Sequence, residues 1–233
     1  MTPLSESSRH DLQSWRTGET DKTGAANVRP SPCVFIIDDD AAVRRALSRL
    51  LKSAGYRLNS FGSTREFLAS DYRSQSPACL VLDVRLPGVS GLDLQNELHK
   101  ANANLPIVFI TGHGNISMSV KAMKSGAVDF LPKPIQDTDL LRAVEQGLAR
   151  AAGEDAQREE IDSIQGRIDT LTPREKEVMT LVVKGWLNKQ IAFELGTAEK
   201  TIKVHRARVM DKMDVSSLAE LVRLAARVGI GQN

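Results

Sequence analysis

The chain has 233 residues, of which 41% are hydrophobic and 26% charged, and its formal net charge is +2. This length is enough for one large domain or two smaller ones, and the composition is that of an ordinary globular protein. No apolar run approaches the roughly 20 residues that a membrane span needs, and the N-terminus has no apolar segment typical of a secretory signal. We therefore expect a cytoplasmic protein with no membrane partner.

Residues 1–32 are polar and show no periodicity, so we expect a disordered N-terminal extension. In residues 33–150, short apolar runs alternate with helical segments. The strongest runs are CVFII, CLVL and PIVFI, and the weaker ones are YRLNSF and AVDFL. Apolar strands that alternate with helices predict a five-stranded, doubly wound parallel sheet with helices on both faces. One of these helices is expected at about Ala41 to Ser53.

The rest of the chain has no strand pattern. A helix is expected to end near residue 150, because Gly153 and a run of charged residues follow, and residues 151–169 are interpreted as a partly helical acidic linker. Residues 170–233 contain four helical segments, the first with a strong start signal in LTPREKEV. A tight turn with Gly196 joins the second and third of these helices, which is a helix-turn-helix arrangement. This C-terminal region carries 11 basic and 7 acidic residues, which hints at nucleic acid.

Polar side chains follow four of the predicted strands where each strand ends. They are Asp38 and Asp39, then Asp83, Thr111 and Lys133. In a parallel sheet of strand order 2-1-3-4-5, these ends meet at one edge, so the carboxylates should converge. Mg²⁺ would neutralise such a cluster, and Lys133 adds a fixed positive charge. The set suits phosphoryl transfer to a carboxylate.

The third C-terminal helix has two different faces when it is projected at 100° per residue. Ile202, Val209 and Met213 share one face, whereas the opposite face carries Lys200, Lys203, Val204 and Ala207. A basic helix behind a tight turn fits the major groove of DNA. A solvated basic face with no partner is the alternative for this helix taken alone.

Residues 33–150 resemble the receiver domain of two-component response regulators, with a CheY- or flavodoxin-like fold. The matching marks are the acidic pair Asp38–Asp39, Asp83 in DVRLPGVSGL, Thr111, Phe130, and Lys133 in KP. The resemblance implies that Asp83 is the phosphoacceptor and that a sensor histidine kinase is the donor.

The same resemblance assigns roles to the other residues of this set. Asp39, Asp83 and the backbone carbonyl of Arg85 would bind Mg²⁺, and Asp38 would act mainly through water. Thr111 would hydrogen-bond the phosphoryl group. Phe130 stands where the family often has Tyr, so a switch there would work by packing alone. The family usually has a cis peptide bond before the proline of the KP motif.

Residues 170–233 resemble the helix-turn-helix output domain of the FixJ/NarL/LuxR type, on the matches LTPREKEV, NKQIA and TIKVH. The resemblance implies that Lys203 and Val204 face bases, while Thr201, His205 and nearby basic residues contact the DNA backbone. Ala207 departs from members with a basic residue at that position. The full set expected at DNA is Lys200, Thr201, Lys203, Val204, His205, Ala207 and Arg208.

Together the two resemblances imply a phosphorylation-switched transcription factor that dimerises and binds promoter DNA, with RNA polymerase as a further partner. The protein would not be an enzyme, although the receiver would catalyse its own phosphorylation from a phosphodonor and its own dephosphorylation. An orphan DNA-binding regulator without phosphorylation is the alternative. A phosphatase of the haloacid dehalogenase type is more remote, because it needs an aspartate where this chain has Arg85.

Overall fold

The computed structural model describes residues 31–103, 105–112 and 116–231. The predicted disorder of the N-terminal extension falls almost wholly on residues 1–30, which lie outside the described ranges. The chain divides after Asp155 into two compact units, and each is described by itself below.

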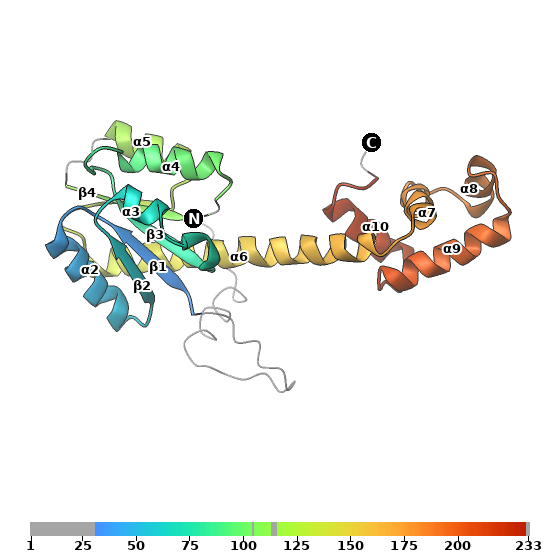
Figure 1. The fold of residues 1–233 in the computed structure, drawn as a ribbon, viewed down its shortest axis with the longest axis horizontal. Coiled ribbons are helices and arrows are strands. Elements are labelled where there is room, and N and C mark those ends of the chain that lie inside the picture. The colour runs from blue at the N-terminus through green and yellow to red at the C-terminus, as the bar shows by residue number, and fades with distance from the viewer. Residues whose placement is uncertain (1–30, 104, 113–115, 232–233) are drawn as a thin grey trace. The chain divides into compact units, whose positions relative to one another are not determined.

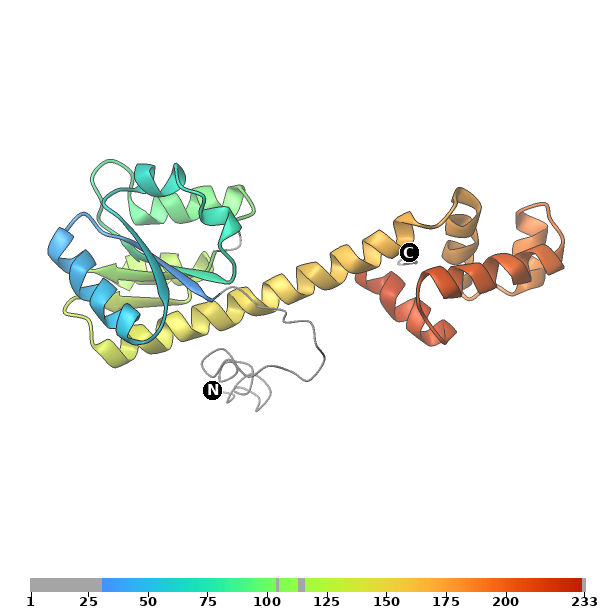
Figure 2. The same cartoon turned by 60° about the horizontal axis from the view of Figure 1, so that its bottom comes forward.

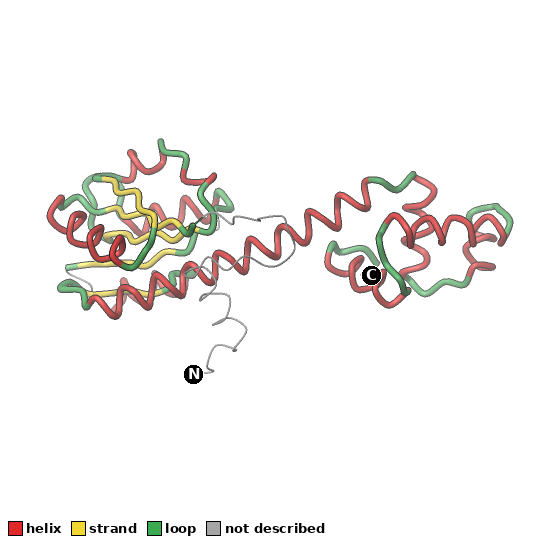
Figure 3. The backbone as a smooth tube through the Cα atoms, turned by 90° about the horizontal axis from the view of Figure 1, so that it is seen from below, coloured by secondary structure: helices red, strands yellow, loops and turns green. Residues whose placement is uncertain are grey.

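The first unit is built on one parallel sheet of five strands, drawn in yellow in Figure 3. The strands are β1 (Cys33–Ile37), β2 (Arg57–Phe61), β3 (Ala78–Asp83), β4 (Ile107–Thr111) and β5 (Asp129–Pro132). Their order is β2-β1-β3-β4-β5, and every neighbouring pair is parallel. This confirms the predicted fold class and strand order. The β1 strand reads as continuous apolar sequence because both of its faces are buried.

Helices cover both faces of the sheet (Figure 1). One face packs against α2 (Ala41–Ser53) and the first part of α6 (Asp137–Asp169); the other packs against α3 (Thr64–Leu68), α4 (Gly91–Lys100) and α5 (Ile116–Lys124). A short 3-10 helix, η1 (Tyr72–Ser74), precedes β3. Successive residues of a strand point to opposite faces of the sheet. Phe35 therefore packs in one core with Phe67 and Leu94, whereas Ile36 packs in the other with Leu51 and Leu140.

The start of α2 fixes the position of the loop that follows β1. The Asp40 carboxylate accepts hydrogen bonds from the N–H groups of Ala42 (2.6 Å) and Val43 (3.4 Å). These donors hold the pKa of Asp40 below its ordinary value, as expected for a carboxylate at a helix N-terminus. Asp40 is therefore engaged with the helix, while Asp38 and Asp39 remain at the strand end.

The expected break in the helix after residue 150 is wrong. The α6 helix is a single element of 33 residues, Asp137–Asp169, and it contains both Gly153 and the acidic segment. A glycine inside a helix costs only about 1 kcal/mol relative to alanine. Around Gly153 the sequence is rich in Ala, Glu, Gln and Arg, which are strong helix formers, so one unfavourable residue does not end the helix. The acidic linker is helical throughout rather than in part.

The second unit consists of the end of α6 and the helices α7 (Pro173–Val183), α8 (Asn188–Glu194), α9 (Glu199–Lys212) and α10 (Leu218–Arg227), orange to red in Figure 2. Its core draws on every one of these helices. The buried side chains include Ile164, Ile168, Val178, Met179, Ile191, Ile202, Val209, Met213 and Leu221. Gly196, in the turn between α8 and α9, has φ of +60°, a conformation that glycine adopts without strain. The predicted helix-turn-helix is present.

The predicted start of α7 is confirmed in detail. The Thr172 hydroxyl accepts from the Glu175 N–H at 3.3 Å, and the Glu175 carboxylate accepts from the Thr172 N–H at 2.9 Å. Pro173 occupies the first helical position, where its missing N–H costs nothing. The reciprocal bonds satisfy backbone groups that a helix end otherwise leaves open.

Candidate functional site

Three carboxylates meet at the carboxyl edge of the sheet. Asp38 and Asp39 directly follow β1, and Asp83 is the last residue of β3. Because β1 and β3 are parallel neighbours, with Ile37 opposite Leu82, their ends lie side by side. One oxygen from each carboxylate lies within 4.8 Å of the others. Asp38 is fully buried and Asp83 is 5% exposed, whereas Asp39 is open to solvent.

Lys133 joins two of these carboxylates from the end of β5. Its ammonium lies 2.6 Å from Asp38 Oδ2 and 2.5 Å from Asp83 Oδ2. Burial lowers the pKa of Lys133, but the hydrogen bonds to Asp38 and Asp83 outweigh it and raise that pKa above its ordinary value. Burial also raises the pKa of Asp38, against the hydrogen bond from Lys133. A buried carboxylate stays charged only when a cation faces it, and Lys133 is that cation.

The cluster has the chemistry of a site for a hard divalent cation. Three carboxylates and one ammonium leave two negative charges, and every donor is an oxygen, which Mg²⁺ prefers. Asp83 Oδ1 accepts from the Arg85 N–H at 2.9 Å, so the backbone of Arg85 lies against the carboxylate. Asp39, which is exposed and does not contact Lys133, is the carboxylate most open to an ion. The donor set therefore fits such an ion, and Asp39 and Asp83 could hold it.

Thr111 lies at the same edge of the sheet as the cluster, and Phe130 lies in β5, three residues before Lys133. Thr111 ends β4 and is 1% exposed, and its carbonyl accepts from the Lys133 N–H at 2.8 Å. Phe130 in β5 is half-buried, and its ring lies 6.2 Å from that of Phe109, centroid to centroid. The peptide bond between Lys133 and Pro134 is cis, as the resemblance implied. The structure thus brings the predicted acidic, hydroxyl and basic residues to one edge, and the expected switch at Phe130 stays a prediction.

Sequence reasoning missed one residue that shapes this site. Gly91, at the start of α4, hydrogen-bonds through its N–H to the Val84 carbonyl at 3.0 Å. A Cβ at this position would collide with the Asp83 backbone carbonyl, so only glycine lets α4 approach the end of β3 so closely. The signal available in the sequence is a glycine in the first turn of a predicted helix.

The α9 helix presents the residues predicted to meet DNA. Ile202 and Val209 are buried in the core, and the opposite side is open to solvent. Six of the seven predicted residues are exposed: Lys200, Thr201, Lys203, Val204, Ala207 and Arg208. The seventh, His205, is half-buried, and its Nδ1 atom has no hydrogen-bond partner. Lys203 also lies 3.6 Å from the carboxylate of Glu199, one turn earlier.

Two polar contacts that fix the position of α9 could not be predicted from the sequence. Arg206 donates to the Asn188 side chain at 2.9 Å, which ties α9 to the start of α8. At the C-terminal end of α9, the Lys212 ammonium lies 2.7 Å from the buried Glu175 carboxylate. This ion pair and the N–H of Thr172 lower the pKa of Glu175 from 4.5 to about 2. Both contacts join residues far apart in sequence, so helix periodicity alone gives no sign of them.

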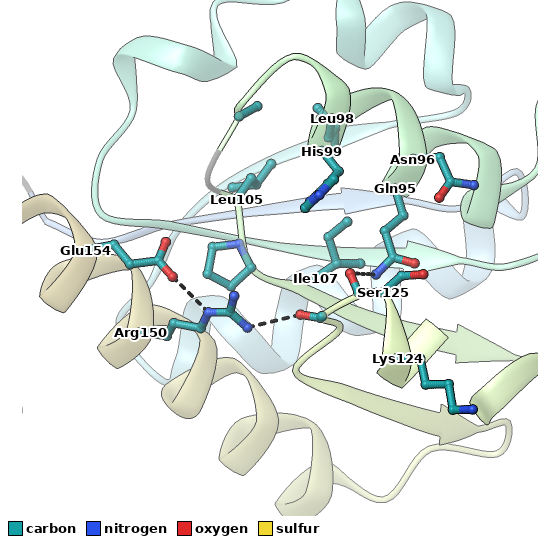
Figure 4. A pocket seen from close by; sticks show the side chains of 13 residues that line it. Gln95, Asn96, Leu98, His99, Leu105, Ile107, Lys124, Ser125, Arg150 and Glu154 are labelled. Atoms are coloured by element: carbon teal, nitrogen blue, oxygen red, sulfur yellow. Dashed lines mark hydrogen bonds and ion pairs between the residues drawn. The ribbon is translucent and has the colours of Figure 1, made fainter. Parts of the chain in front are cut away.

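A hollow of about 470 Å³ lies beside Ile107 at the amino end of β4, whereas Thr111 stands at the carboxyl end of that strand. Figure 4 shows the side chains that line the hollow. Its lining comes from α4, β4, the end of α5 and α6, and it includes Gln95, His99, Ile107, Arg150 and Glu154. Arg150 donates to Glu154 at 2.9 Å and to the Gly126 carbonyl at 3.0 Å, so its charge is already matched. None of the predicted site residues lines this hollow. The size of a cavity therefore does not locate the chemistry here.

In the part of the chain that the structure describes, no helix has the length and apolar character needed to cross a membrane.

A sheet with an acidic cluster and a lysine at its carboxyl edge, followed by a helix-turn-helix unit, defines a response regulator with a DNA-binding output domain. Residues 34–145 match the family model of the response regulator receiver domain, and residues 169–225 match that of the bacterial regulatory proteins of the luxR family. The chain belongs to the two-component response regulators that combine a receiver with a LuxR-type helix-turn-helix domain. It is a transcription regulator by family, and not an enzyme.

The similarity to individual relatives extends over most of the chain. Nodulation protein W of Bradyrhizobium diazoefficiens is 48% identical over 200 residues, which are 86% of this chain and 88% of that protein. The solved structure of response regulator StyR is 48% identical, covers 84% of this chain and 99% of its own, and has a TM-score of 0.76. Full-length FixJ from B. japonicum is 41% identical and covers 86% of this chain and 98% of its own, with a TM-score of 0.51.

Proposed function

We propose that a sensor histidine kinase phosphorylates Asp83, and that the phosphorylated protein dimerises and binds promoter DNA to control transcription. The observation that carries this proposal is the Lys133 ammonium, which lies within 2.6 Å of both Asp38 and Asp83 while Asp39 stays open beside them. The receiver domain implies a kinase partner, and the LuxR-type domain implies a DNA partner. Because that DNA lies in the cytoplasm, the cytoplasm is the compartment in which we expect this protein. RNA polymerase is the further partner we expect at the promoter.

In the proposed reaction, an oxygen of the Asp83 carboxylate attacks the phosphorus of a phosphohistidine. The new O–P bond forms as the P–N bond breaks, and the imidazole leaves with the bonding electron pair. Bound Mg²⁺ would supply positive charge to the phosphoryl oxygens. Lys133 lies beside Asp83 and stabilises the same developing charge, and Thr111, at the end of the neighbouring strand, would donate its hydroxyl to the phosphoryl group.

The role we propose for Asp38 follows from its burial. As a fully buried carboxylate in contact with Lys133, it holds the ammonium at the site rather than meeting the substrate itself. Together with Asp39 it provides the negative charge that attracts the cation. The attacking carboxylate of Asp83, the acidic pair Asp38–Asp39 and the fixed ammonium of Lys133 thus lie at the ends of three different strands, β3, β1 and β5.

Phosphorylation by a small phosphodonor tests the proposal directly. Full-length protein is incubated with acetyl phosphate and Mg²⁺, and the base-labile acyl phosphate is measured by intact-protein mass spectrometry. We expect one phosphoryl group on the wild type and none on Asp83→Asn. The control is Asp137→Asn, which removes an exposed carboxylate in the first turn of α6, and it should be phosphorylated like the wild type.

The same samples decide whether phosphate controls the output. We expect acetyl phosphate to increase both the dimer fraction, measured by light scattering, and the affinity for duplex DNA. If Asp83→Asn acquires the acyl phosphate as well as the wild type does, the assignment of the phosphoacceptor is wrong. If phosphorylation occurs but leaves dimerisation and DNA affinity unchanged, the protein is an orphan DNA-binding regulator in which phosphate has no such role.

A further inference from the structure

We propose that Arg44 is a positioning residue that holds Asp38 and Asp39 in the conformation that binds a divalent cation. The inference rests on the cation site of the proposed function and extends it to a residue outside the acidic cluster. One guanidinium nitrogen of Arg44, Nη1, donates to the carbonyl of Asp38 at 2.6 Å and to that of Asp39 at 2.9 Å. These are backbone contacts, so they act on the direction of the chain and not on the carboxylates directly.

The two residues differ in how many other contacts hold them. Asp38 donates its N–H to the Phe61 carbonyl at 3.3 Å, and its carboxylate accepts from the Asp40 N–H at 2.8 Å and from Lys133 at 2.6 Å. The carboxylate of Asp40 is used by the start of α2. Within the described ranges, the bond from Arg44 is the only hydrogen bond made to Asp39. Because a bond to two consecutive carbonyls fixes two peptide planes, it also fixes the direction in which the Asp39 side chain leaves the backbone.

The position of Arg44 on α2 explains why this side chain can reach the loop. Arg44 follows the N-cap Asp40 by four residues, and it is half-buried, whereas the next residue, Arg45, is exposed. The side chain of Arg44 turns back along the helix towards the loop, as helical side chains lean towards the N-terminus. Both bonds come from Nη1, whose two N–H groups have fixed directions in the plane of the guanidinium, whereas a lysine ammonium rotates freely.

The charge of Arg44 and its hydrogen bonds should affect Mg²⁺ affinity in opposite directions. A guanidinium near the acidic cluster repels Mg²⁺, so removal of its charge should tighten cation binding slightly. Loss of the hydrogen bonds should weaken binding, because residues that orient metal ligands typically change metal affinity by roughly 10- to 100-fold. The two effects therefore differ in sign, and a neighbouring arginine of the same charge separates them.

The test is the affinity of the full-length protein for Mg²⁺, measured by isothermal titration calorimetry without phosphodonor. We expect Arg44→Met to weaken Mg²⁺ binding by about tenfold. The matched control Arg45→Met, which removes the same charge from the adjacent residue, should bind within about twofold of the wild type or slightly more tightly. Arg44→Lys should recover part of the affinity, since it restores a donor nitrogen without the fixed geometry of the guanidinium, which a purely steric role for the side chain would not explain.

Several outcomes would overturn the proposal. Equal Mg²⁺ affinities of folded Arg44→Met and Arg45→Met would show that Arg44 does not position the ligands, and an Arg44→Lys variant no tighter than Arg44→Met would exclude the donor role. Circular dichroism checks the fold, and if Arg44→Met fails to fold, Arg44→Gln is compared with Arg45→Met by the same criterion. If the wild type itself binds no Mg²⁺, the cation site of the proposed function fails, and the role of Arg44 fails with it.

Discussion

The two units of this protein place their charged residues in opposite ways. In the receiver, Asp38, Asp83 and Lys133 are far apart in sequence and are brought together by strand order, mostly out of contact with water. In the second unit, the charges predicted to meet DNA follow one another along α9 and are exposed. The first site therefore exists only when the sheet is folded, whereas the second is continuous in sequence and depends on the fold only for its orientation. Single substitutions should therefore have larger effects in the receiver.

The largest effect is expected from Lys133→Met. This change removes the ammonium that contacts Asp38 and Asp83, so charge that develops on the phosphoryl group loses a fixed cation. We expect phosphorylation by acetyl phosphate to slow by roughly 100-fold, as when one preorganised donor is removed from a reaction site. The initial rate of acyl phosphate formation, followed by mass spectrometry, measures the effect.

The matched change for Lys133 is Lys124→Met, which removes an exposed lysine at the end of α5. It should leave the rate within about twofold of the wild type, because an exposed charge at a distance is screened. If Lys133→Met is folded and is phosphorylated as fast as Lys124→Met, Lys133 does not stabilise the developing charge. The expectation that substitutions have larger effects in the receiver would then be wrong.

A smaller effect, on stability, is expected from Glu175→Gln in the second unit. The change breaks the ion pair with Lys212 and leaves its ammonium without a charged partner. We expect the free energy of unfolding of this unit to fall by roughly 1–3 kcal/mol at pH 7. Trp186 packs against the core of this unit, and its fluorescence in a Trp15→Phe background follows urea unfolding. Glu177→Gln, at an exposed ion pair, is the control and should cost less than about 1 kcal/mol.

The pH dependence of that difference has a definite sign. The pKa of Glu175 is about 2 in the folded protein and 4.5 in its ordinary state. Because the folded pKa is lower, the carboxylate stabilises the fold above pH 4.5, and the contribution disappears as the pH falls from 4.5 towards 2. The gap between the wild type and Glu175→Gln should therefore be full at pH 7 and narrow steadily below pH 4.5. If the difference in unfolding free energy between the wild type and Glu175→Gln stays constant as the pH falls from 4.5 to about 2, the ion pair does not have this role.

The smallest of these effects is expected from Lys203→Ala on α9. Loss of one exposed lysine should weaken binding to a duplex selected from random-sequence DNA by about 1 kcal/mol. Lys184→Ala, an exposed lysine that caps α7, should have little effect. Fluorescence anisotropy at two salt concentrations measures the affinity of each protein for selected and for unselected DNA. A loss of affinity for the selected DNA alone indicates a base contact by Lys203. Equal losses on both DNAs would place Lys203 on the backbone rather than at a base.

The sequence predicted most of what local pattern controls. β1 and α2 have the expected bounds, since a continuous apolar run and a capped amphipathic segment leave little choice. The edge where Asp38, Asp83 and Lys133 meet followed from strand order alone. The predicted end of α6 near residue 150 is wrong, because the helix-forming neighbours of Gly153 outweigh the cost of that glycine. The contacts of Arg44, Arg206 and Lys212 depend on tertiary structure, so no periodicity could reveal them.

One feature of α6 bears on how the DNA-binding half of the protein can be handled by itself. Ile164 and Ile168, at its C-terminal end, are 3% and 5% exposed in the core of the second unit. A fragment that starts at Thr170, where the helix-turn-helix pattern begins, would lack both side chains and uncover the apolar surface beneath them. Truncating one such side chain to alanine typically costs about 2–5 kcal/mol. Any shortened protein intended for DNA work should therefore begin upstream of Ile164 and keep the last turns of the long helix.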